Sequence, residues 1–369
     1  MNTIIIEWPL DGHYPHSVHV FRLPAGCRGV VVVDDITLGP AIGGVRMNAD
    51  VTAGEVARLA RAMTLKNAAA GLPHGGGKAG IQTPAGFFAA DTERVIRAFG
   101  YALRDLRDYI PGPDMGTNET AMAWIHDETG RAVGLPQALG GIPLDEIGAT
   151  GYGLAVCAKA LSDLGRLQLD GARIAIQGFG AVGQHAARFL VELGAKVIAV
   201  SDRGGGAYDE DGLDIAALAA AKQQGWSVAD AAGVKPLTQE ELLALDCDVL
   251  IPAAQPDVIT ASNAGLVSAR VVLPGANIAV TGPAEAALHR RGVLVMPDFI
   301  ANAGGVICAA IEYRGGDQAL AFAAIARQIH ANTAEVIDRI AVGGHTPTEA
   351  AREMALERIS AAAVYRRKF

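Results

Sequence analysis

Aromatic residues, charged residues and clusters of basic residues are all scarce in this chain of 369 residues. Aromatic residues make up 5% and charged residues 19% of the sequence, while hydrophobic residues make up 50%. This composition excludes a disordered chain and is typical of a globular protein with a large core. The formal net charge is −8 and no long Lys/Arg run offsets it, which argues against nucleic acid as a partner.

Cysteines and long apolar runs are also scarce. The four cysteines are Cys27, Cys157, Cys247 and Cys308. They form no C-x-x-C pair, so we expect neither disulfides nor a zinc site, and a reducing cytoplasm fits best. The even spacing of His13, His16 and His19 matches no zinc signature, so we expect no metal. No segment reaches the ~18–20 apolar residues of a membrane helix, and the N-terminal MNTIIIEWPLDGH lacks the basic lead-in of a signal peptide.

The chain is long enough for two domains, and the pattern of predicted elements changes along it. Residues 1–135 mix β-branched runs such as RGVVVVDD with helices, one of which opens with Thr52 and Glu55 at capping-box spacing. In residues 136–330, strands and helices alternate as in a parallel sheet covered by helices. Residues 331–369 are predicted to be helical and to join the first domain. The predicted fold class is therefore α/β, with two domains.

The second domain contains a dinucleotide-binding fingerprint in its expected setting. Gly178, Gly180 and Gly183 form a G-x-G-x-x-G motif after the predicted strand ARIAIQ, and Ala181 and Val182 lie in the helix that it opens. The first glycine makes a tight turn, the second lets a pyrophosphate approach, and the third lets helix and strand pack closely. The helix N-terminus binds the anion through its free N–H groups and its dipole. A glycine-rich turn without a cofactor is the alternative.

The next predicted strand ends at Asp202. An acidic side chain at this position can bind both ribose hydroxyls of NAD and repel the 2′-phosphate of NADP. The adjacent Arg203 could instead meet a phosphate. The sequence therefore favours NAD, with NADP as the alternative.

Two lysines flank a glycine-rich turn in LKNAAAGLPHGGGKAGI. This is no P-loop, because the position six before Lys78 is Leu72 and an alanine follows the lysine. Lys66 shares the apolar stripe of the predicted helix with Met63. If both lysines face one dry cleft, their repulsion favours a neutral amine, which is a usable general base; surface lysines are the alternative. Asp114, in PGPDMGT, either caps the following helix or exchanges protons with a substrate.

The chain resembles the glutamate/leucine/phenylalanine/valine dehydrogenase family over nearly its whole length. The resemblance rests on six blocks in the family's order, LGPAIGGVRM, AMTLKNAAAGLPHGGGKAGI, PGPDMGT, GFGAVG, PGAN and ANAGGVICAAIEY. It implies reversible NAD(P)-dependent oxidative deamination of an L-amino acid to a 2-oxo acid and ammonia. It also implies an N-terminal domain for substrate and oligomer contacts, a Rossmann-type NAD domain, an active site in the cleft between them, and a homo-oligomer.

The resemblance also implies roles for individual residues. Lys66 matches the lysine that binds the substrate α-carboxylate, and Lys78 matches the catalytic lysine that activates water. Asp114 matches the catalytic aspartate that exchanges protons with the amino group. The other expected contacts are Gly43 and Asn277 for the substrate, Thr150 and Asn277 for the nicotinamide end of the cofactor, and Ala253 for the cofactor.

The substrate side chain is predicted to be hydrophobic. Enzymes for glutamate resemble P-[YF]-K-G-G where this chain has Ile42 in place of the lysine, and they carry a serine where it has Ala309. Met63 and Val306 extend the same apolar wall. A γ-carboxylate there would be desolvated without a partner at a cost of several kcal/mol, whereas an aliphatic or aromatic group gains about 25 cal/mol per Å² buried. The pocket residues are thus closest to the leucine/phenylalanine/valine group.

Three alternatives remain at this point. Glutamate is the first, because GGIPLDEIGATGYG in the nucleotide half looks more like the glutamate enzymes. A non-catalytic NAD-binding sensor is the second, although it would not need both Lys78 and Asp114. A 2-hydroxy-acid dehydrogenase is the third, but it needs a histidine base paired with an arginine, and His74 beside the glycine run is more typical of a structural histidine.

Overall fold

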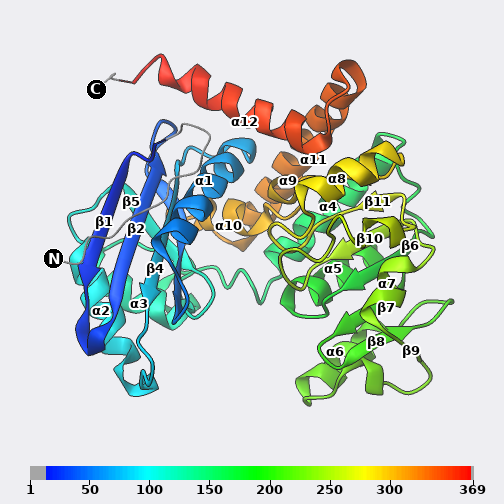
Figure 1. Cartoon of the computed structure of the whole chain (residues 1–369), viewed down its shortest axis with the longest axis horizontal. Helices are drawn as coiled ribbons and strands as arrows, with labels where there is room; N and C mark the ends of the chain where they lie inside the picture. Colours follow the sequence, from blue (N-terminus) through cyan, green and yellow to red (C-terminus); the bar gives the residue numbers. More distant parts are fainter. Residues whose placement is uncertain (1–13, 367–369) are drawn as a thin grey trace. The chain divides into compact units, whose positions relative to one another are not determined.

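The computed structural model describes residues 14–366 (Figure 1). By its internal contacts the chain forms two compact units. Within the described residues, unit 1 comprises 14–143, 306–321 and 354–366, and unit 2 comprises 144–305 and 322–353. This division differs from the expected one, because 136–143 and 306–321 group with unit 1 and 331–353 group with unit 2. The N-terminal segment MNTIIIEWPLDGH, which ends at His13, lies outside the described residues.

Among the described residues, unit 1 is built on a five-stranded sheet in the order β1-β2-β4-β3-β5. Strand β2 is antiparallel to β1 and β4, whereas β3 is parallel to both β4 and β5. The elements are β1 (Ser17–Arg22), β2 (Arg28–Asp35), β3 (Ala41–Asn48), α1 (Ala53–Ala69), β4 (Gly76–Gln82), α2 (Thr92–Leu103), β5 (Tyr109–Pro113) and α3 (Glu119–Thr129). The expected mixture of strands and helices is present.

The two faces of this sheet are covered differently, because successive side chains of a strand point to opposite sides. On one face, Phe99 of α2 and Met122 of α3 are fully buried in a core with residues of β2 to β5. On the other face α1 lies so close to β4 that a Cβ on Gly76 would meet Thr64 N at 2.0 Å, and one on Gly80 would meet Val56 at 2.8 Å. The alternating glycines of β4 therefore let the helix approach the sheet on the face that carries Lys78.

Unit 2, within the described residues, contains a seven-stranded sheet in the order β12-β11-β10-β6-β7-β8-β9. From β12 to β7 the neighbouring strands are parallel, and β8 and β9 are added antiparallel. The order of β8, β7, β6, β10, β11 and β12 is the 3-2-1-4-5-6 order of the doubly wound dinucleotide-binding fold, with its third strand reversed. The predicted α/β class with a Rossmann-type second domain is confirmed.

The strands and helices of unit 2, and those that follow, have these bounds. They are α4 (Ala149–Asp163), β6 (Arg173–Gln177), α5 (Ala181–Glu192), β7 (Lys196–Asp202), β8 (Gly205–Tyr208), α6 (Ile215–Gln223), β9 (Lys235–Leu237), α7 (Gln239–Ala244), β10 (Val249–Pro252), β11 (Val271–Val272), α8 (Gly282–Arg290), β12 (Leu294–Val295), α9 (Asp298–Ala301), α10 (Gly304–Tyr313), α11 (Gln318–Gly343) and α12 (Pro347–Ala363). Parallel strands without hairpin links require such intervening helices.

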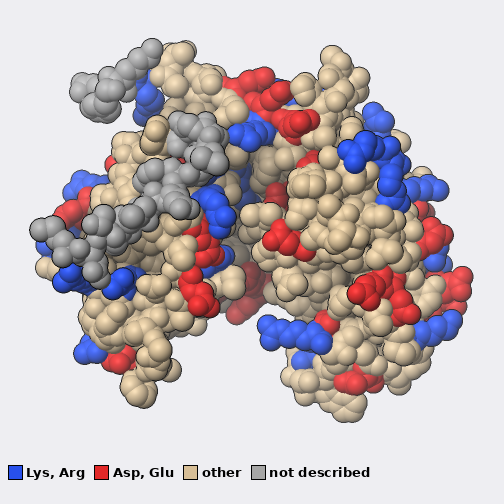
Figure 2. All heavy atoms as spheres, viewed as in Figure 1, with Lys and Arg blue, Asp and Glu red and all other residues tan. Residues whose placement is uncertain are grey.

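Two contacts connect distant segments of unit 1. Arg358 of α12 donates from Nη1 to the carbonyl of Ala69 at 2.6 Å, at the C-terminus of α1. Glu312 of α10 accepts the N–H groups of Leu135 and Ile142, both at 3.0 Å, and so ties both ends of the segment between these two residues to one helix. No helix in residues 14–366 combines the length and the apolar character that a membrane crossing requires. On the visible face, basic and acidic side chains are interspersed (Figure 2).

Candidate active site

Lys78 and Asp114 meet in unit 1 across a strand that separates them. Lys78 lies on β4 and Asp114 directly follows β5, yet Lys78 Nζ is 2.9 Å from Asp114 Oδ1. The intervening strand β3 places Gly44 between them, where a Cβ would lie 2.8 Å from Asp114 Cβ and 3.1 Å from Lys78 Nζ. Because Gly44 has no side chain, the two charged groups can reach each other.

Arg46 and Glu55 extend this pair into a network that the sequence did not predict. Asp114 Oδ2 accepts a hydrogen bond from Arg46 Nε at 2.7 Å, and Glu55 Oε1 accepts one from Arg46 Nη1 at 2.5 Å. Thr52 Oγ1 caps α1 by accepting from the Glu55 N–H, but the Glu55 carboxylate bonds Arg46 rather than completing a capping box. Arg46 is two residues after Gly44 and shares its face of β3. This spacing is the sequence feature from which its position beside Asp114 could have been predicted.

The network sets the ionisation of both central groups. Burial lowers the pKa of the Lys78 ammonium, and the nearby Asp114 carboxylate offsets that shift only in part. Burial also acts to raise the pKa of Asp114, but Lys78 and Arg46 outweigh it, and this pKa is lowered. The sequence argument expected repulsion between two lysines to neutralise one of them. That explanation is wrong as the main cause, because desolvation of a side chain that is only 5% exposed comes first.

Asp114 does not cap the following helix, which was one of its two sequence interpretations. Asn118 is the N-cap of α3, and its side chain accepts from the N–H of Ala121 at 3.0 Å. The backbone of Asp114 is instead fixed by Thr117, whose hydroxyl accepts the Asp114 N–H at 3.0 Å and donates to the carbonyl of Val45 at 2.8 Å. The carboxylate is therefore held toward Lys78 and Arg46.

The predicted substrate-binding residues of unit 1 lie on three elements. Met63 and Lys66 are half-buried on the last turns of α1, where Asn67 donates to the carbonyls of Ile42 and Gly75. Ile42 is 3% exposed on β3, and the next residue, Gly43, approaches β4 so closely that a Cβ would overlap the Gly77 carbonyl. Val306 and Ala309 lie on α10. Their common wall stays a prediction.

His74 has the structural environment that its position in the glycine run predicted. Its ring is buried, its Nδ1 lies 3.1 Å from the carbonyl oxygen of Pro40, and it makes an edge contact with Tyr313 at 5.7 Å between ring centroids. Burial lowers the pKa of His74, which favours a neutral ring. Its contacts support packing rather than a catalytic base.

We expect Arg46→Gln to shift the pH profile of turnover toward higher pH. The Arg46 charge lowers the pKa of Lys78, so its removal raises that pKa and moves the base-dependent limb of kcat/KM upward. Arg46→Lys should leave the profile close to that of the unaltered enzyme, because it retains the positive charge. Arg97→Gln is the matched control, since Arg97 also bonds two carboxylates, Glu93 and Asp127, but on the surface. An unchanged profile in Arg46→Gln would contradict this positioning role.

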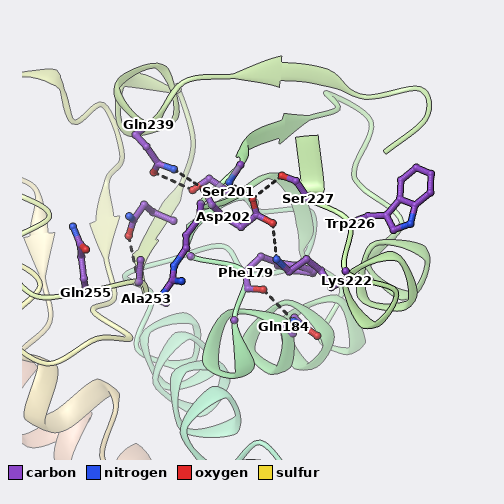
Figure 3. Close-up of a pocket in the computed structure, with 17 residues that line it drawn as sticks. Phe179, Gln184, Ser201, Asp202, Lys222, Trp226, Ser227, Gln239, Ala253 and Gln255 are labelled. Atoms are coloured by element: carbon purple, nitrogen blue, oxygen red, sulfur yellow. Dashed lines mark hydrogen bonds and ion pairs between the residues drawn. The ribbon is translucent and has the colours of Figure 1, made fainter. Parts of the chain in front are cut away.

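In unit 2, a cavity of about 800 Å³ adjoins the glycine fingerprint. Its size is in the ~300–1,000 Å³ range of pockets for small molecules and cofactors. Gly178, Gly180, Asp202 and Ala253 line it, as expected of cofactor-binding residues. Sequence reasoning missed other lining residues, because no motif marks them. These include Gln177 and five residues labelled in Figure 3, namely Lys222, Trp226, Ser227, Gln239 and Gln255.

The three fingerprint glycines occupy different surroundings. Gly178 has φ +101°, and a Cβ there would meet Ala254 N at 2.6 Å, while a Cβ on Gly183 would meet the Gly178 carbonyl oxygen at 2.0 Å. A Cβ on Gly180 would meet no atom within 4 Å among the described residues. Gly180 is the N-cap of α5, and no side chain caps this helix. The uncapped N–H groups beside Gly180 and the adjoining cavity fit a pyrophosphate.

The remaining predicted cofactor-binding residues contact different parts of unit 2. Val182, in the first turn of α5 after Ala181, and Ala253, after β10, both adjoin Gly275, where a Cβ would lie 3.2 Å and 2.8 Å from them respectively. Asn277 Oδ1 accepts from Asn302 Nδ2 at 3.1 Å. Thr150 lies on α4, and its hydroxyl would be 3.1 Å from a Cβ on Gly305. These roles stay predictions.

The Asp202 carboxylate accepts several hydrogen bonds from the protein itself, which conflicts with its expected role of binding the ribose hydroxyls of NAD. Its carboxylate accepts from the N–H groups of Gly204 at 2.8 Å and Val228 at 3.1 Å, from the Ser227 hydroxyl at 2.7 Å, and from Lys222 Nζ at 2.6 Å. Figure 3 shows Ser227 and Lys222 directed at this carboxylate. Despite partial burial, these donors lower the pKa of Asp202 to about 2.

Family profiles match both parts of the chain. Residues 15–131 match the Glu/Leu/Phe/Val dehydrogenase dimerisation domain, and residues 140–367 match the Glutamate/Leucine/Phenylalanine/Valine dehydrogenase profile. The chain belongs to this family. It is an oxidoreductase of the amino acid dehydrogenase type, and the family uses nicotinamide cofactors.

Two curated relatives of this dehydrogenase differ in cofactor. The NADP-specific glutamate dehydrogenase of Saccharolobus shibatae is 40% identical over 75% of this chain and 68% of its own length. The catabolic NAD-specific glutamate dehydrogenase of Bacillus subtilis is 40% identical over 76% of this chain and 69% of its own length. Membership of the family therefore does not determine whether NAD or NADP is bound. That preference depends on the residues of the cofactor site.

Two solved structures are similar to this dehydrogenase over most of its length. The hetero-hexameric glutamate dehydrogenase of Thermus thermophilus, in a Leu-bound form, has a TM-score of 0.86 and 32% identity over 96% of this chain and 91% of its own. The L-tryptophan dehydrogenase of Nostoc punctiforme has a TM-score of 0.73 and 26% identity over 94% and 96%. The dimerisation profile and the hexameric relative support an oligomer.

Proposed function

We propose that this dehydrogenase catalyses the reversible oxidative deamination of a branched-chain or aromatic L-amino acid to the 2-oxo acid and ammonia. The observation that carries the proposal is the pair of buried Lys78 and half-buried Asp114, which meet across Gly44 on the face of the sheet that also carries Ile42. A binding protein that only senses NAD needs no such pair. The pair is suited to moving protons near a small substrate.

Four residues of unit 1 have distinct roles in the proposed reaction. When bound, the nicotinamide cofactor takes up the hydride from the substrate α-carbon. Lys66 binds the α-carboxylate, and Asp114, ionised by its neighbours, takes a proton from the amino group. Lys78, with its lowered pKa, acts as the base that activates water for attack on the imino carbon. Arg46 is a positioning residue that holds Asp114.

The hydrophobic substrate is supported by the surroundings of Ile42. Its buried aliphatic side chain occupies the position where the glutamate enzymes resemble a lysine. Ile42 lies two residues before Gly44 on β3 and shares its face of the strand. It therefore lies on the side of the sheet where Lys78 and Asp114 meet. A γ-carboxylate beside it would lose its hydration without gaining a cation. The similarity to a tryptophan dehydrogenase is in line with this, whereas the two curated relatives above are named for glutamate.

Two further properties belong to this proposal. We infer a homo-oligomer assembled through unit 1, which matches the dimerisation-domain profile. The four cysteines are unpaired and buried, which supports the expected reducing cytoplasm.

Substrate preference is tested by kcat/KM for L-leucine, L-valine, L-phenylalanine, L-tryptophan and L-glutamate. We expect at least one hydrophobic substrate to exceed L-glutamate by about 10²-fold, the equivalent of roughly 2.7 kcal/mol of side-chain discrimination. The double variant Ile42→Lys, Ala309→Ser should narrow that difference by raising the value for glutamate. A clear preference of the unaltered enzyme for glutamate would exclude the hydrophobic pocket and leave the glutamate alternative.

A further inference from the structure

We propose that the cofactor pocket of unit 2 contains a 2′-phosphate subsite formed by Arg203 and Lys222, so that this dehydrogenase binds NADP(H) at least as tightly as NAD(H). The subsite belongs to the cofactor site of the proposed function and rests on that function. It replaces the expectation that Asp202 selects NAD.

Asp202 cannot read the ribose of NAD in the state that the structure describes. An ionised carboxylate has about four lone-pair positions for hydrogen bonds. Four protein donors, two backbone N–H groups with the Ser227 hydroxyl and the Lys222 ammonium, already occupy it. Ribose hydroxyls could bond Asp202 only by displacing one of these donors. The usual attraction of NAD to an acidic residue here is therefore lost.

The charge balance at this end of the pocket favours a phosphate. Lys222 Nζ is 2.6 Å from Asp202 Oδ2 and neutralises its charge, which removes the usual repulsion of a 2′-phosphate. Arg203 lines the same pocket, and within residues 14–366 its guanidinium is paired with no acidic side chain. Taken together, these three side chains carry one net positive charge.

The two cations also retain donors for a ligand. A lysine ammonium carries three N–H donors, and Lys222 gives one of them to Asp202. A guanidinium carries five donors in a planar fork that matches a phosphate in bidentate geometry. Arg203 and Lys222 together can thus bind the oxygens of a phosphate group.

The turn that carries Arg203 is fixed in place. Asp202 Oδ1 accepts from the Gly204 N–H and from Ser227 Oγ, so both sides of the turn are tied to one carboxylate oxygen. A Cβ on Gly204 would meet Ser227 Oγ at 2.3 Å, so only glycine fits this approach. The role of Asp202 is then to hold the turn that presents Arg203, and it does not contact the cofactor.

Cofactor affinity measured by fluorescence titration with NADPH and NADH tests this subsite without reference to turnover. We expect the Kd of NADPH to be equal to or below that of NADH, and to rise more steeply with salt because the extra contact is ionic. Arg203→Gln should raise the Kd of NADPH by about tenfold, the effect of one charge-assisted contact, and leave that of NADH nearly unchanged. Arg270→Gln is the control, since Arg270 is an exposed arginine of unit 2 outside the pocket.

Asp202→Asn separates the two roles of the carboxylate. If Asp202 holds the turn, the variant weakens NADPH binding at least as much as NADH binding. If Asp202 instead bonds the ribose hydroxyls, only NADH binding weakens, and the subsite is refuted. An unaltered enzyme that binds NADPH about tenfold more weakly than NADH also overturns the subsite and leaves the proposed function intact. Failure of both dinucleotides to bind would overturn the proposed function as well.

Discussion

Lys78→Ala is expected to reduce kcat for amino acid oxidation by about 10²- to 10⁴-fold, the usual contribution of a positioned general base. The reason is that Lys78 is the buried amine whose pKa is lowered by desolvation, so that its neutral, basic form is more accessible than that of an ordinary lysine. Binding of NADH and NADPH should be retained, because the cofactor pocket is lined by residues of unit 2. Steady-state kinetics and cofactor titration of the same preparation measure both effects.

Two further variants show whether a loss of activity in Lys78→Ala comes from the missing amine or from loss of folding. Lys78→Met keeps most of the volume of the buried side chain and should be equally inactive. Lys196→Ala removes an exposed lysine of β7 and should remain active. Turnover by Lys78→Ala within about tenfold of the unaltered enzyme would refute the assigned role, because that difference is below the usual range for a general base.

Asp114→Asn is expected to lower kcat by a similar factor of about 10²- to 10⁴-fold, since an amide cannot take a proton from the substrate amino group. It should also change the pH dependence in a defined direction. The Asp114 charge raises the pKa of Lys78, so its removal lowers that pKa further, and the base limb of residual kcat/KM moves to lower pH. This shift is opposite to the one expected for Arg46→Gln.

The direction of the pH shift distinguishes proton transfer and electrostatics from a structural defect. Asp127→Asn is the matched control, because Asp127 accepts from Arg97 Nη1 at 2.6 Å on the surface, much as Asp114 accepts from Arg46. It should alter neither kcat nor the pH profile. An Asp114→Asn enzyme with lower kcat but an unmoved profile would mean that the carboxylate acts only through folding.

The elements and the fold class could be predicted from the sequence because they depend on near neighbours. The run RGVVVVDD forms β2, Thr52 caps α1, and the glycine fingerprint connects β6 to α5. Turn chemistry, capping and hydrophobic periodicity act over a few residues, so the sequence displays them directly. The order of the strands in each sheet was not visible in this way.

Only the tertiary structure decided how the charged residues are paired. Arg46 contacts Asp114 from 68 residues away, and Asp202 is bonded by Lys222 and Ser227, which lie 20 and 25 residues further along the chain. No local pattern encodes such partners, because they depend on which strands are adjacent and on which side chains face one another. The sequence by itself determined which chemical groups this dehydrogenase has. The fold determined that Lys78 meets Asp114 across Gly44, and that the carboxylate expected to bind ribose is occupied by protein donors.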